Sequence, residues 1–298
     1  MLSINIPVFN IEVTKLVQQL IVQAKKLDKA FEIRVYDDGS SEEVKKVNRR
    51  ISSLPNVVYV ELEQNLGRSA IRNKMGTEAT QKHLLFIDAD SEIVTDNYLE
   101  LFLEIAKPNR VICGGTTYKK EMPADSEKYL RWFYGTNREA VSAEIRKGKK
   151  GFIITSNNFL IEKEVFKRIR FREDLKTYGH EDTLLGYDLF KGGVEIFHIN
   201  NPVEHTGLED AELFLEKTKT ALANLYKITH ELLATDDDFT TQVHFLNRYK
   251  KITKFIPAGI FRFFYKTFRS VIEKNLLGKS PHLFLFDLYK IGFYSTLK

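Results

Sequence analysis

The chain has 298 residues, of which 43% are hydrophobic and 29% charged, and a formal net charge of +5. This composition is typical of a globular protein of one or two domains, and the mild charge gives no reason to expect a nucleic-acid partner. A single cysteine, Cys113, excludes an intramolecular disulfide and fits a reducing compartment. No apolar run reaches about 18 residues, which predicts no transmembrane helix. Only Met1 precedes the first apolar run, so we expect no signal peptide and a cytoplasmic protein.

Apolar runs and amphipathic segments alternate through the first third of the chain. Strands are predicted at residues 2–8, 31–36, 57–62 and 84–87. Helices are predicted over residues 13–27, after a cap at Ser40 or Ser41, and after the turn at 65–69. This alternation predicts an α/β fold with a doubly wound, mostly parallel sheet and right-handed crossovers.

Polar clusters follow three of these strands directly. They are Asp37-Asp38, the turn from Asn65 to Arg68, and Asp88-Ala89-Asp90. In a parallel sheet all three gather at the edge where ligands bind. Asp88 follows the run Leu84–Ile87, which suits a strand buried on both faces. Because hard cations choose oxygen ligands, a divalent cation is the natural partner of this Asp-x-Asp pair.

The next segments are a predicted helix at 96–106 and a predicted strand at 110–113. Gly114-Gly115 follows, which either lets the backbone approach a ligand or simply makes a turn. The pattern then changes over residues 123–150, where an aromatic helix precedes a basic stretch: Tyr129, Trp132, Phe133 and Tyr134, then Arg146, Lys147, Lys149 and Lys150. Aromatic groups of this kind are more often core than ligand platform. A loop-rich insertion above the sheet edge is nevertheless where an acceptor would dock.

Further polar groups lie in the second half of the chain. Thr155-Ser156-Asn157-Asn158 lies between apolar residues, so these side chains are expected to reach a ligand or buried backbone groups. Glu181 and Asp182 open a predicted helix that runs to about Lys191, a position that favours acids in any protein. A strand is predicted at 194–199. His205 follows it, and a lone histidine is more often structural than a ligand.

The C-terminal part has a different character. Residues 208–233 predict an amphipathic helix, and the tail from Val243 interleaves aromatic and aliphatic residues with lysine and arginine. Such a segment either lies in an anionic membrane interface or forms a helical subdomain packed on the main sheet. The cationic bias favours the membrane interpretation.

Taken together, five motifs resemble those of the family 2 glycosyltransferases, which have the GT-A fold. They are Ile6–Asn10, Asp37–Ser40, Asn65–Gly67 with Ala70–Asn73, Asp88–Asp90, and Glu181-Asp182. They follow the family's order over about the first 207 residues. The resemblance implies a nucleotide-sugar-binding half (1–115), an acceptor-binding and catalytic half (116–207), and a C-terminal helical extension (208–298) outside the match.

The resemblance also implies roles for individual residues. The base and ribose of the nucleotide would contact Pro7, Phe9, Asp37 and Asp38, and the turn near the nucleotide implicates Asn65, Gly67 and Arg68. Asp88 would face the ribose or the metal, and Asp90 would bind a metal that bridges the diphosphate. Asp182 is the first choice for the catalytic base and Glu181 the second. His205 matches a late histidine that ligates the metal in some GT-A enzymes, with His198 as a weaker alternative.

The activity implied is inverting transfer, dependent on Mn²⁺ or Mg²⁺, from a nucleotide diphosphate sugar, with a UDP-sugar as the expected donor. The acceptor is expected to be a glycan or lipid-linked hydroxyl in surface polysaccharide synthesis, at the inner face of the cell membrane. Processive members often carry Gln-x-x-Arg-Trp after the acidic pair. The chain lacks this motif, which favours addition of a single sugar.

Three other functions fit the sequence less well. A nucleotidyltransferase normally has a glycine-rich basic loop after the first strand, where this chain has Phe9–Glu12. A dinucleotide-dependent oxidoreductase would have Gly-x-Gly-x-x-Gly there. An inactive, membrane-associated scaffold with a transferase-like core would be expected to lack carboxylates, yet all the expected ones are present.

Overall fold

The computed structural model describes residues 1–148, 152 and 154–297, so Lys149 and Lys150 of the predicted basic stretch lie outside the described residues. The chain forms two compact units. Unit 1 comprises residues 1–118, 140–176 and 181–207, and unit 2 comprises residues 119–139, 177–180 and 208–298. Every carboxylate predicted for the site belongs to unit 1.

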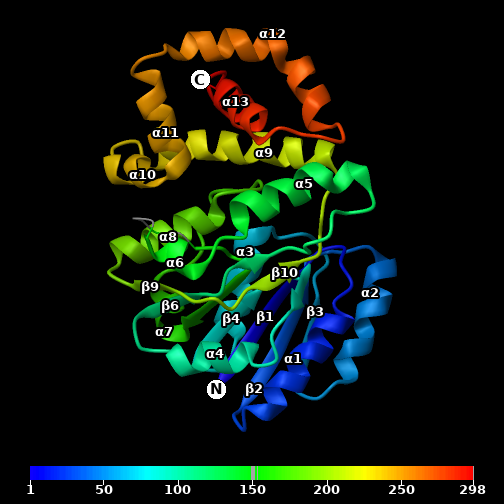
Figure 1. Cartoon of the computed structure of the whole chain (residues 1–298). Coiled ribbons are helices and arrows are strands. Elements are labelled where there is room, and N and C mark those ends of the chain that lie inside the picture. Colours follow the sequence, from blue (N-terminus) through cyan, green and yellow to red (C-terminus); the bar gives the residue numbers. More distant parts are fainter. Residues whose placement is uncertain (149–151, 153, 298) are drawn as a thin grey trace. The chain divides into compact units, whose positions relative to one another are not determined.

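Unit 1 is built on a seven-stranded sheet with the order β3-β2-β1-β4-β8-β6-β9 (Figure 1). Strands β3, β2, β1 and β4 are parallel, β8 is antiparallel to both of its neighbours, and β9 is parallel to β6. The predicted doubly wound, mostly parallel α/β sheet is therefore confirmed, with one reversed strand. The strands are β1 (Leu2–Val8), β2 (Phe31–Asp37), β3 (Val57–Glu61), β4 (His83–Ile87), β6 (Arg110–Cys113), β8 (Asn158–Glu162) and β9 (Glu195–His198).

Helices cover both faces of this sheet. One apolar cluster joins it to α1 (Thr14–Lys26) and α4 (Tyr98–Ile105), and another joins it to α3 (Arg68–Glu78), α7 (Lys163–Arg168) and α8 (Glu181–Lys191). Strand β4 alternates between them. Leu85 and Ile87 belong to the first cluster, and Leu84 and Phe86 to the second. This double burial, worth about 1.5–3 kcal/mol for each large side chain, explains why the run is continuously apolar.

A second, three-stranded sheet was not predicted, and it positions part of the site. Its order is β5-β10-β7, formed by β5 (Ser91–Ile93), β10 (Val203–His205) and β7 (Thr116–Thr117). In the antiparallel pair, His205 lies opposite Ser91, the residue directly after Asp90. The small sheet therefore brings the late histidine to the Asp-x-Asp turn. Its strands have only two or three residues, which is too short for a periodic signal.

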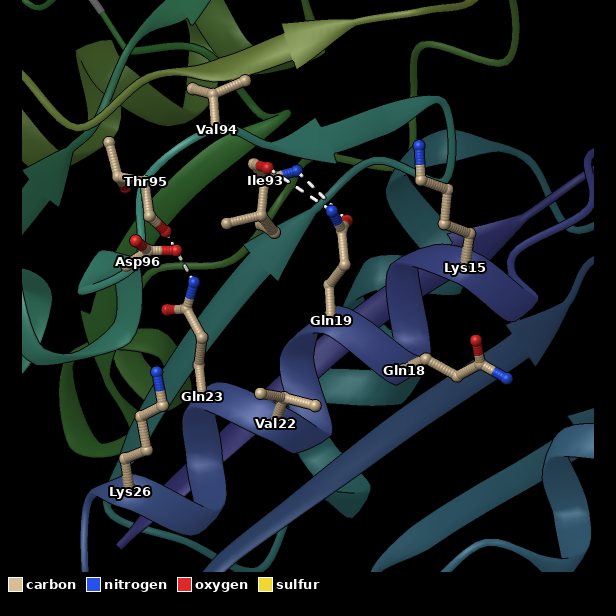
Figure 2. Close-up of a pocket in the computed structure, with 10 residues that line it drawn as sticks. All are labelled: Lys15, Gln18, Gln19, Val22, Gln23, Lys26, Ile93, Val94, Thr95 and Asp96. Atoms are coloured by element: carbon tan, nitrogen blue, oxygen red, sulfur yellow. Dashed lines mark hydrogen bonds between the residues drawn. The ribbon is translucent and has the colours of Figure 1, made fainter.

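A hollow of about 410 Å³ lies between α1 and the segment that contains β5 (Figure 2). The amides of α1 are occupied there: Gln19 accepts from the backbone N–H of Ile93 at 3.4 Å, and Gln23 donates to the carbonyl of Thr95 at 2.6 Å. None of the predicted site carboxylates lines this hollow. We therefore regard it as a by-product of the packing of α1 against β5.

Unit 2 is helical. Its helices are α5 (Tyr129–Tyr134), α9 (Ala211–Lys227), α10 (Asp237–Gln242), α11 (His244–Thr253), α12 (Ala258–Leu276) and α13 (Leu283–Tyr294). Leu130, Leu215, Leu276, Phe286 and Tyr289 join α5, α9, α12 and α13 in a common apolar core. The predicted helix over 208–233 is α9, continued by a π-helical turn at Ile228–Leu232. None of the described helices has both the length and the apolar character needed to cross a bilayer.

The aromatic group of α5 lies partly in this core. The ring of Tyr134 packs against Phe214 and Phe286, with centroids 5.4 and 5.3 Å away. Tyr129 instead stacks on Trp132 and Phe133 along the helix, and all three rings are half-buried. Core packing, the more common use of such residues, is therefore confirmed for Tyr134.

Candidate active site

The first two loops at the carboxyl edge of the sheet are bonded to each other. The backbone N–H of Asn10 donates to Oγ of Ser40, and Oδ1 of Asn10 accepts from the N–H of Ser41, both at 2.8 Å. Asn10 has φ = 55°, a conformation that asparagine tolerates better than most residues. Pro7, the second-last residue of β1, is half-buried, and Phe9, just after the strand, is 52% exposed. An apolar ring left this open can stack on a planar ligand.

Asp37, the last residue of β2, is fully buried. Its Oδ1 accepts from the backbone N–H of Ser40 at 2.7 Å. Its Oδ2 has no hydrogen-bond partner among the described residues. Because a buried carboxylate oxygen without a donor is costly, this atom can accept a hydrogen bond from a bound ligand.

Asp38 holds the next loop in place. Its two carboxylate oxygens accept from the backbone N–H groups of Leu66 at 2.7 Å and Gly67 at 3.1 Å, and the Asn65 amide donates to its carbonyl at 3.0 Å. Burial raises the pKa of Asp38, and the two N–H donors partly offset this. Gly67 has φ = +87°, which glycine adopts without strain. Asp38 therefore fixes the shape of the turn that carries Asn65 and Gly67.

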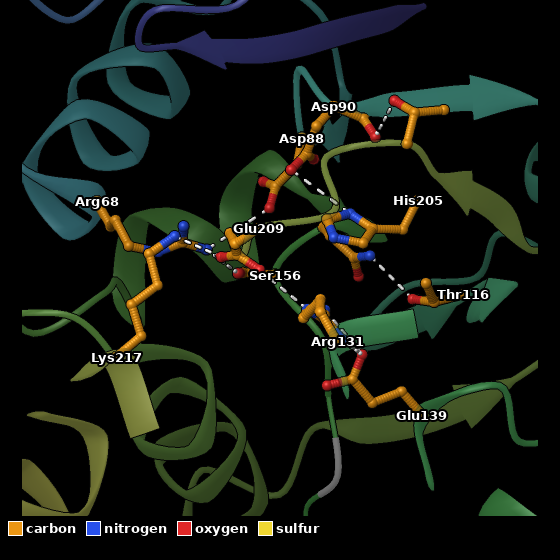
Figure 3. Close-up of polar contacts among 12 residues, drawn as sticks. Arg68, Asp88, Asp90, Thr116, Arg131, Glu139, Ser156, His205, Glu209 and Lys217 are labelled. Carbon is orange, nitrogen blue, oxygen red and sulfur yellow. Dashed lines mark hydrogen bonds and ion pairs between the residues drawn. The ribbon is translucent and has the colours of Figure 1, made fainter. Parts of the chain in front are cut away.

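Arg68 connects the Asp-x-Asp turn to the start of α8. Its Nε donates to Oε1 of Glu181. One Nη lies 3.5 Å from Oδ2 of Asp88 and 3.4 Å from Oγ of Ser156 (Figure 3). The Glu181 side chain is 6% exposed, whereas that of Arg68 is 40% exposed. Burial alone would raise the pKa of Glu181, but Arg68 and then Arg72 reverse this and lower it. Glu181 is therefore held as a carboxylate.

Asp88 is enclosed by two arginines. The buried Arg72 donates to its Oδ1 and to the carbonyl of Arg68, while Arg68 approaches Oδ2. Burial would raise the pKa of Asp88, but Arg72 and then Arg68 more than offset this, and the pKa is lowered. Because both of its oxygens are engaged, Asp90 is the more available carboxylate of the pair for a cation.

Asp90 faces His205. Its Oδ2 lies 3.4 Å from Nδ1 of His205 (Figure 3), and its carbonyl accepts from both the N–H and the hydroxyl of Thr206 at 2.8 Å. The imidazole packs edge-on against Tyr118, and its Nε2 is buried with no hydrogen-bond partner among the described residues. Gly207 runs so close that a Cβ there would lie 2.5 Å from Oδ2 of Asp90.

Asp182 is the second residue of α8 and is half-buried. Burial and then the neighbouring Glu181 raise its pKa to about 7. Its Oδ1 accepts from the backbone N–H of Thr183 at 2.7 Å. A carboxylate with a pKa near neutrality can accept a proton more readily than an ordinary aspartate, while Glu181 beside it is engaged with Arg68.

Protein groups lie very close to Gly114-Gly115. A Cβ at Gly115 would lie 2.6 Å from the Arg146 guanidinium, and one at Gly114 would overlap the carbonyl of Asn201. Arg146 is buried and donates to the carbonyls of Cys113, Gly114 and Ile199. These glycines therefore make room for protein groups, and Arg146 serves the fold.

His198 lies in a cationic environment. Its Nδ1 is 3.2 Å from a guanidinium nitrogen of Arg146. Burial and then Arg146 lower its pKa to about 4. This neighbour disfavours a bound cation, so we retain His205 and not His198 as the candidate ligand.

Sequence reasoning assigned no role to three residues that lie beside the site: Arg72, Thr116 and Gly207. It did predict that Ser156 and Asn157 reach a ligand or buried backbone groups. The Asn157 amide donates to the hydroxyl of Thr116 at 2.9 Å, and its Oδ1 is buried without a partner among the described residues. Asn158 instead binds the backbone carbonyls of Gly115 and Asn201. Arg72 lies within the quoted motif Ala70–Asn73, which was the one available signal for it.

Residues 3–170 match the model of glycosyl transferase family 2. A comparison with curated proteins gave no match.

Solved structures share the fold. A mannosyltransferase from Pyrobaculum calidifontis, PcManGT, in complex with GDP-Man and Mn²⁺, superposes with a TM-score of 0.56 at 15% identity, over 77% of this chain and 64% of its own. TarS of S. aureus superposes with a TM-score of 0.55 at 18% identity, over 97% of this chain and 54% of its own. Residues 1–349 of TarS in complex with UDP superpose with a TM-score of 0.50 at 16% identity, over 98% of this chain and 89% of that structure. These likenesses establish the GT-A fold. The chain spans about two thirds or less of PcManGT and of the longer TarS structure.

Proposed function

Because this chain belongs to glycosyl transferase family 2, we propose that it transfers one sugar from a nucleotide diphosphate sugar to an acceptor hydroxyl with inversion at the anomeric carbon. The observation that carries the proposal is the position of Arg68, which contacts Asp88 in the Asp-x-Asp turn and Glu181 beside Asp182. Arg68 brings the group that would bind the donor and the group that would accept the proton into one site. A UDP-sugar is the donor we expect.

For the nucleotide, the proposed contacts are Pro7, Phe9, Asp37, Asp38, Asn65, Gly67, Arg68 and Asp88. The uncommitted Oδ2 of Asp37 supports a contact with a donor on the base or ribose. Phe9 offers an exposed ring beside the same edge. Arg68 would be the cation that meets the diphosphate, and the 40% exposure of its side chain supports this.

For the metal, we propose that Mn²⁺ or Mg²⁺ binds Asp90 and His205, with Asp88 as an additional candidate. Among the described residues no three His, Cys, Asp or Glu side chains form a cage. The pair nevertheless fits, because these cations commonly use one or two protein ligands and take the rest from water and substrate phosphates. The 3.4 Å separation between Oδ2 of Asp90 and Nδ1 of His205 supports this. When bound, the ion would stabilise the negative charge that develops on the leaving diphosphate.

For proton transfer, we propose Asp182 as the base, with Glu181 as its second choice. The raised pKa of Asp182 supports this order, and the ion pair with Arg68 argues against Glu181. A positioned carboxylate that removes the acceptor's proton contributes roughly 10²- to 10⁴-fold in rate. Attack from the face opposite the leaving group would invert the anomeric centre.

The proposed acceptor is a hydroxyl of a glycan or a lipid-linked glycan in surface polysaccharide synthesis, with residues 1–115 serving the donor and residues 116–207 the acceptor. The proposed place of action is the inner face of the cell membrane, with the C-terminal extension (208–298) in contact with it.

The test is a panel of nucleotide sugars with and without Mn²⁺, read as thermal shift and as release of the nucleoside diphosphate. We expect one UDP-sugar to raise the melting temperature only when Mn²⁺ is present. Isothermal titration with UDP and Mn²⁺ distinguishes the enzyme from an inactive scaffold. No binding at millimolar ligand would contradict the proposal.

A further inference from the structure

The outer face of α12 exposes an unusual number of large apolar side chains. Phe255, just before the helix, is 87% exposed, and Phe263 and Val271 are 69% and 68% exposed. Ile260 is also more than half exposed. By their spacing, Ile260, Phe263 and Val271 fall on one side of the helix, which we call the outer face of α12.

These apolar side chains are exposed although α12 also contributes residues to an apolar core. The opposite side of α12 carries Tyr265, Ile272 and Leu276, which are buried in the unit 2 core together with residues of α9 and α13. Helix α13 lies directly beside α12 (Figure 1). Arg262 also fixes the helix, because its Nε donates to the carbonyl of Ser295 at 3.0 Å. The helix is therefore anchored on one side while its other side meets solvent with apolar groups. Monomeric soluble proteins rarely expose large apolar patches that have no binding partner.

The charged residues in the segment that contains α12 are mostly basic. Residues 250–282 contain a single acid, Glu273, and eight basic residues: Lys250, Lys251, Lys254, Arg262, Lys266, Arg269, Lys274 and Lys279. Glu273 is already bonded to Arg269 and to the hydroxyl of Tyr289. Lys254, Lys266 and Lys274 are exposed. The face thus combines apolar side chains with a strong excess of positive charge.

We propose that the outer face of α12 is a docking surface for an anionic lipid bilayer, with Phe255, Ile260, Phe263 and Val271 inserted among the lipids and the lysines at the headgroups. Apolar burial and attraction to anionic headgroups are the two components of interfacial helix binding. A second copy of this chain would bring the same basic residues against each other, so the charge favours lipid over self-association. The inference does not depend on the proposed catalytic function, because it uses no residue of the site.

The experiment is flotation of the full chain with vesicles of phosphatidylglycerol mixed with phosphatidylcholine and with vesicles of phosphatidylcholine alone. We expect binding to the mixed vesicles, weaker binding to the neutral ones, and loss of binding as salt rises. In the double variant Phe263→Ser and Val271→Ser, the partition coefficient onto the mixed vesicles should fall by about tenfold or more. Lys266→Gln and Lys274→Gln should each weaken binding to the mixed vesicles about fivefold.

Matched controls lie on other surfaces. Leu213→Ser removes a half-exposed leucine from α9, and Lys46→Gln removes an exposed lysine from α2 (Glu42–Asn48). Both should float as the wild type does. Thermal unfolding by circular dichroism checks that every variant is folded.

Three results would overturn the proposal. One is failure of the folded wild type to bind the mixed vesicles. Another is equal flotation of the wild type and the Phe263→Ser, Val271→Ser variant. The third is a wild type that does not bind vesicles and is a dimer by light scattering, together with a monomeric Phe263→Ser, Val271→Ser variant. That result would assign the face to a second copy of the chain.

Discussion

Oδ2 of Asp90 lies 3.4 Å from Nδ1 of His205, although the two residues are far apart in the sequence. Pairing of β10 with β5 creates this contact, because it sets His205 opposite Ser91. The contact makes the proposed metal role of each residue open to test.

Asp90→Asn should abolish sugar transfer while the protein stays folded. The amide keeps the size of the side chain but removes the negative charge proposed to hold the cation, so we expect turnover to fall by about 100-fold or more. Asp96→Asn, an exposed aspartate of the same segment, is the control and should keep full activity. The measurement is sugar transfer in the presence of Mn²⁺. Full activity of Asp90→Asn would show that Asp90 is not a metal ligand.

Gly207→Ala should weaken Mn²⁺ binding. The added Cβ would lie 2.5 Å from Oδ2 of Asp90, so the carboxylate or the loop must move. In Gly259→Ala the new methyl group meets nothing within 4 Å, and that variant should bind Mn²⁺ normally. Titration of each protein with Mn²⁺ in the presence of UDP measures the difference. Equal affinities would show that the position of Asp90 does not matter for the cation.

Asp182→Asn should retain nucleotide binding and lose transfer by roughly 10²- to 10⁴-fold, because a neutral amide cannot accept the acceptor's proton. In the wild type, kcat should rise with pH and level off above about 7, as the Asp182 carboxyl loses its proton. Asp174→Asn, an exposed aspartate before α8, serves as the control. If Asp182→Asn lost UDP binding instead, the residue would have a structural role.

The same carboxyl should affect folding stability in a defined pH range. Its pKa is about 7 in the folded protein, against about 3.9 in an unfolded chain, so the folded state binds more protons between these values. Its contribution to stability is then greatest below the unfolded pKa and declines as the pH rises through the folded pKa. The unfolding free energy of the wild type, compared with that of Asp182→Asn, should therefore fall between about pH 4 and pH 7. Urea titrations across this range measure it, and a difference that increases with pH would contradict the raised pKa.

Arg68→Ala should destabilise the protein by about 1–3 kcal/mol, because it leaves the buried Glu181 without its charged hydrogen-bond donor. Addition of Glu181→Gln should recover part of the loss, since the uncompensated charge is then removed. Arg50→Ala, at an exposed arginine, should stay within about 0.5 kcal/mol of the wild type. Urea unfolding gives all these values. If the double variant recovered no stability, the ion pair between Arg68 and Glu181 would not be what stabilises the protein.

The amino-acid sequence by itself determined the alternation of strands and helices in unit 1. Apolar periodicity and turn residues are local, so the strand Arg110–Cys113 and the helix Glu181–Lys191 have the predicted bounds. It also determined that Asp37, Asp38, Asp88 and Asp90 lie at the carboxyl ends of strands, because a motif next to an apolar run keeps that place in any parallel sheet.

Only the tertiary structure decided which partner each of these groups has. The contacts of Arg68 with Glu181 and of His205 with Asp90 join segments that are distant in sequence. No local sequence pattern predicts such contacts. The same holds for Gly115, whose neighbour is the guanidinium of Arg146. For α12 the sequence predicted an amphipathic, basic segment. The packing of Tyr265 and Leu276 decided which side is buried, and it left Phe263 and Val271 exposed.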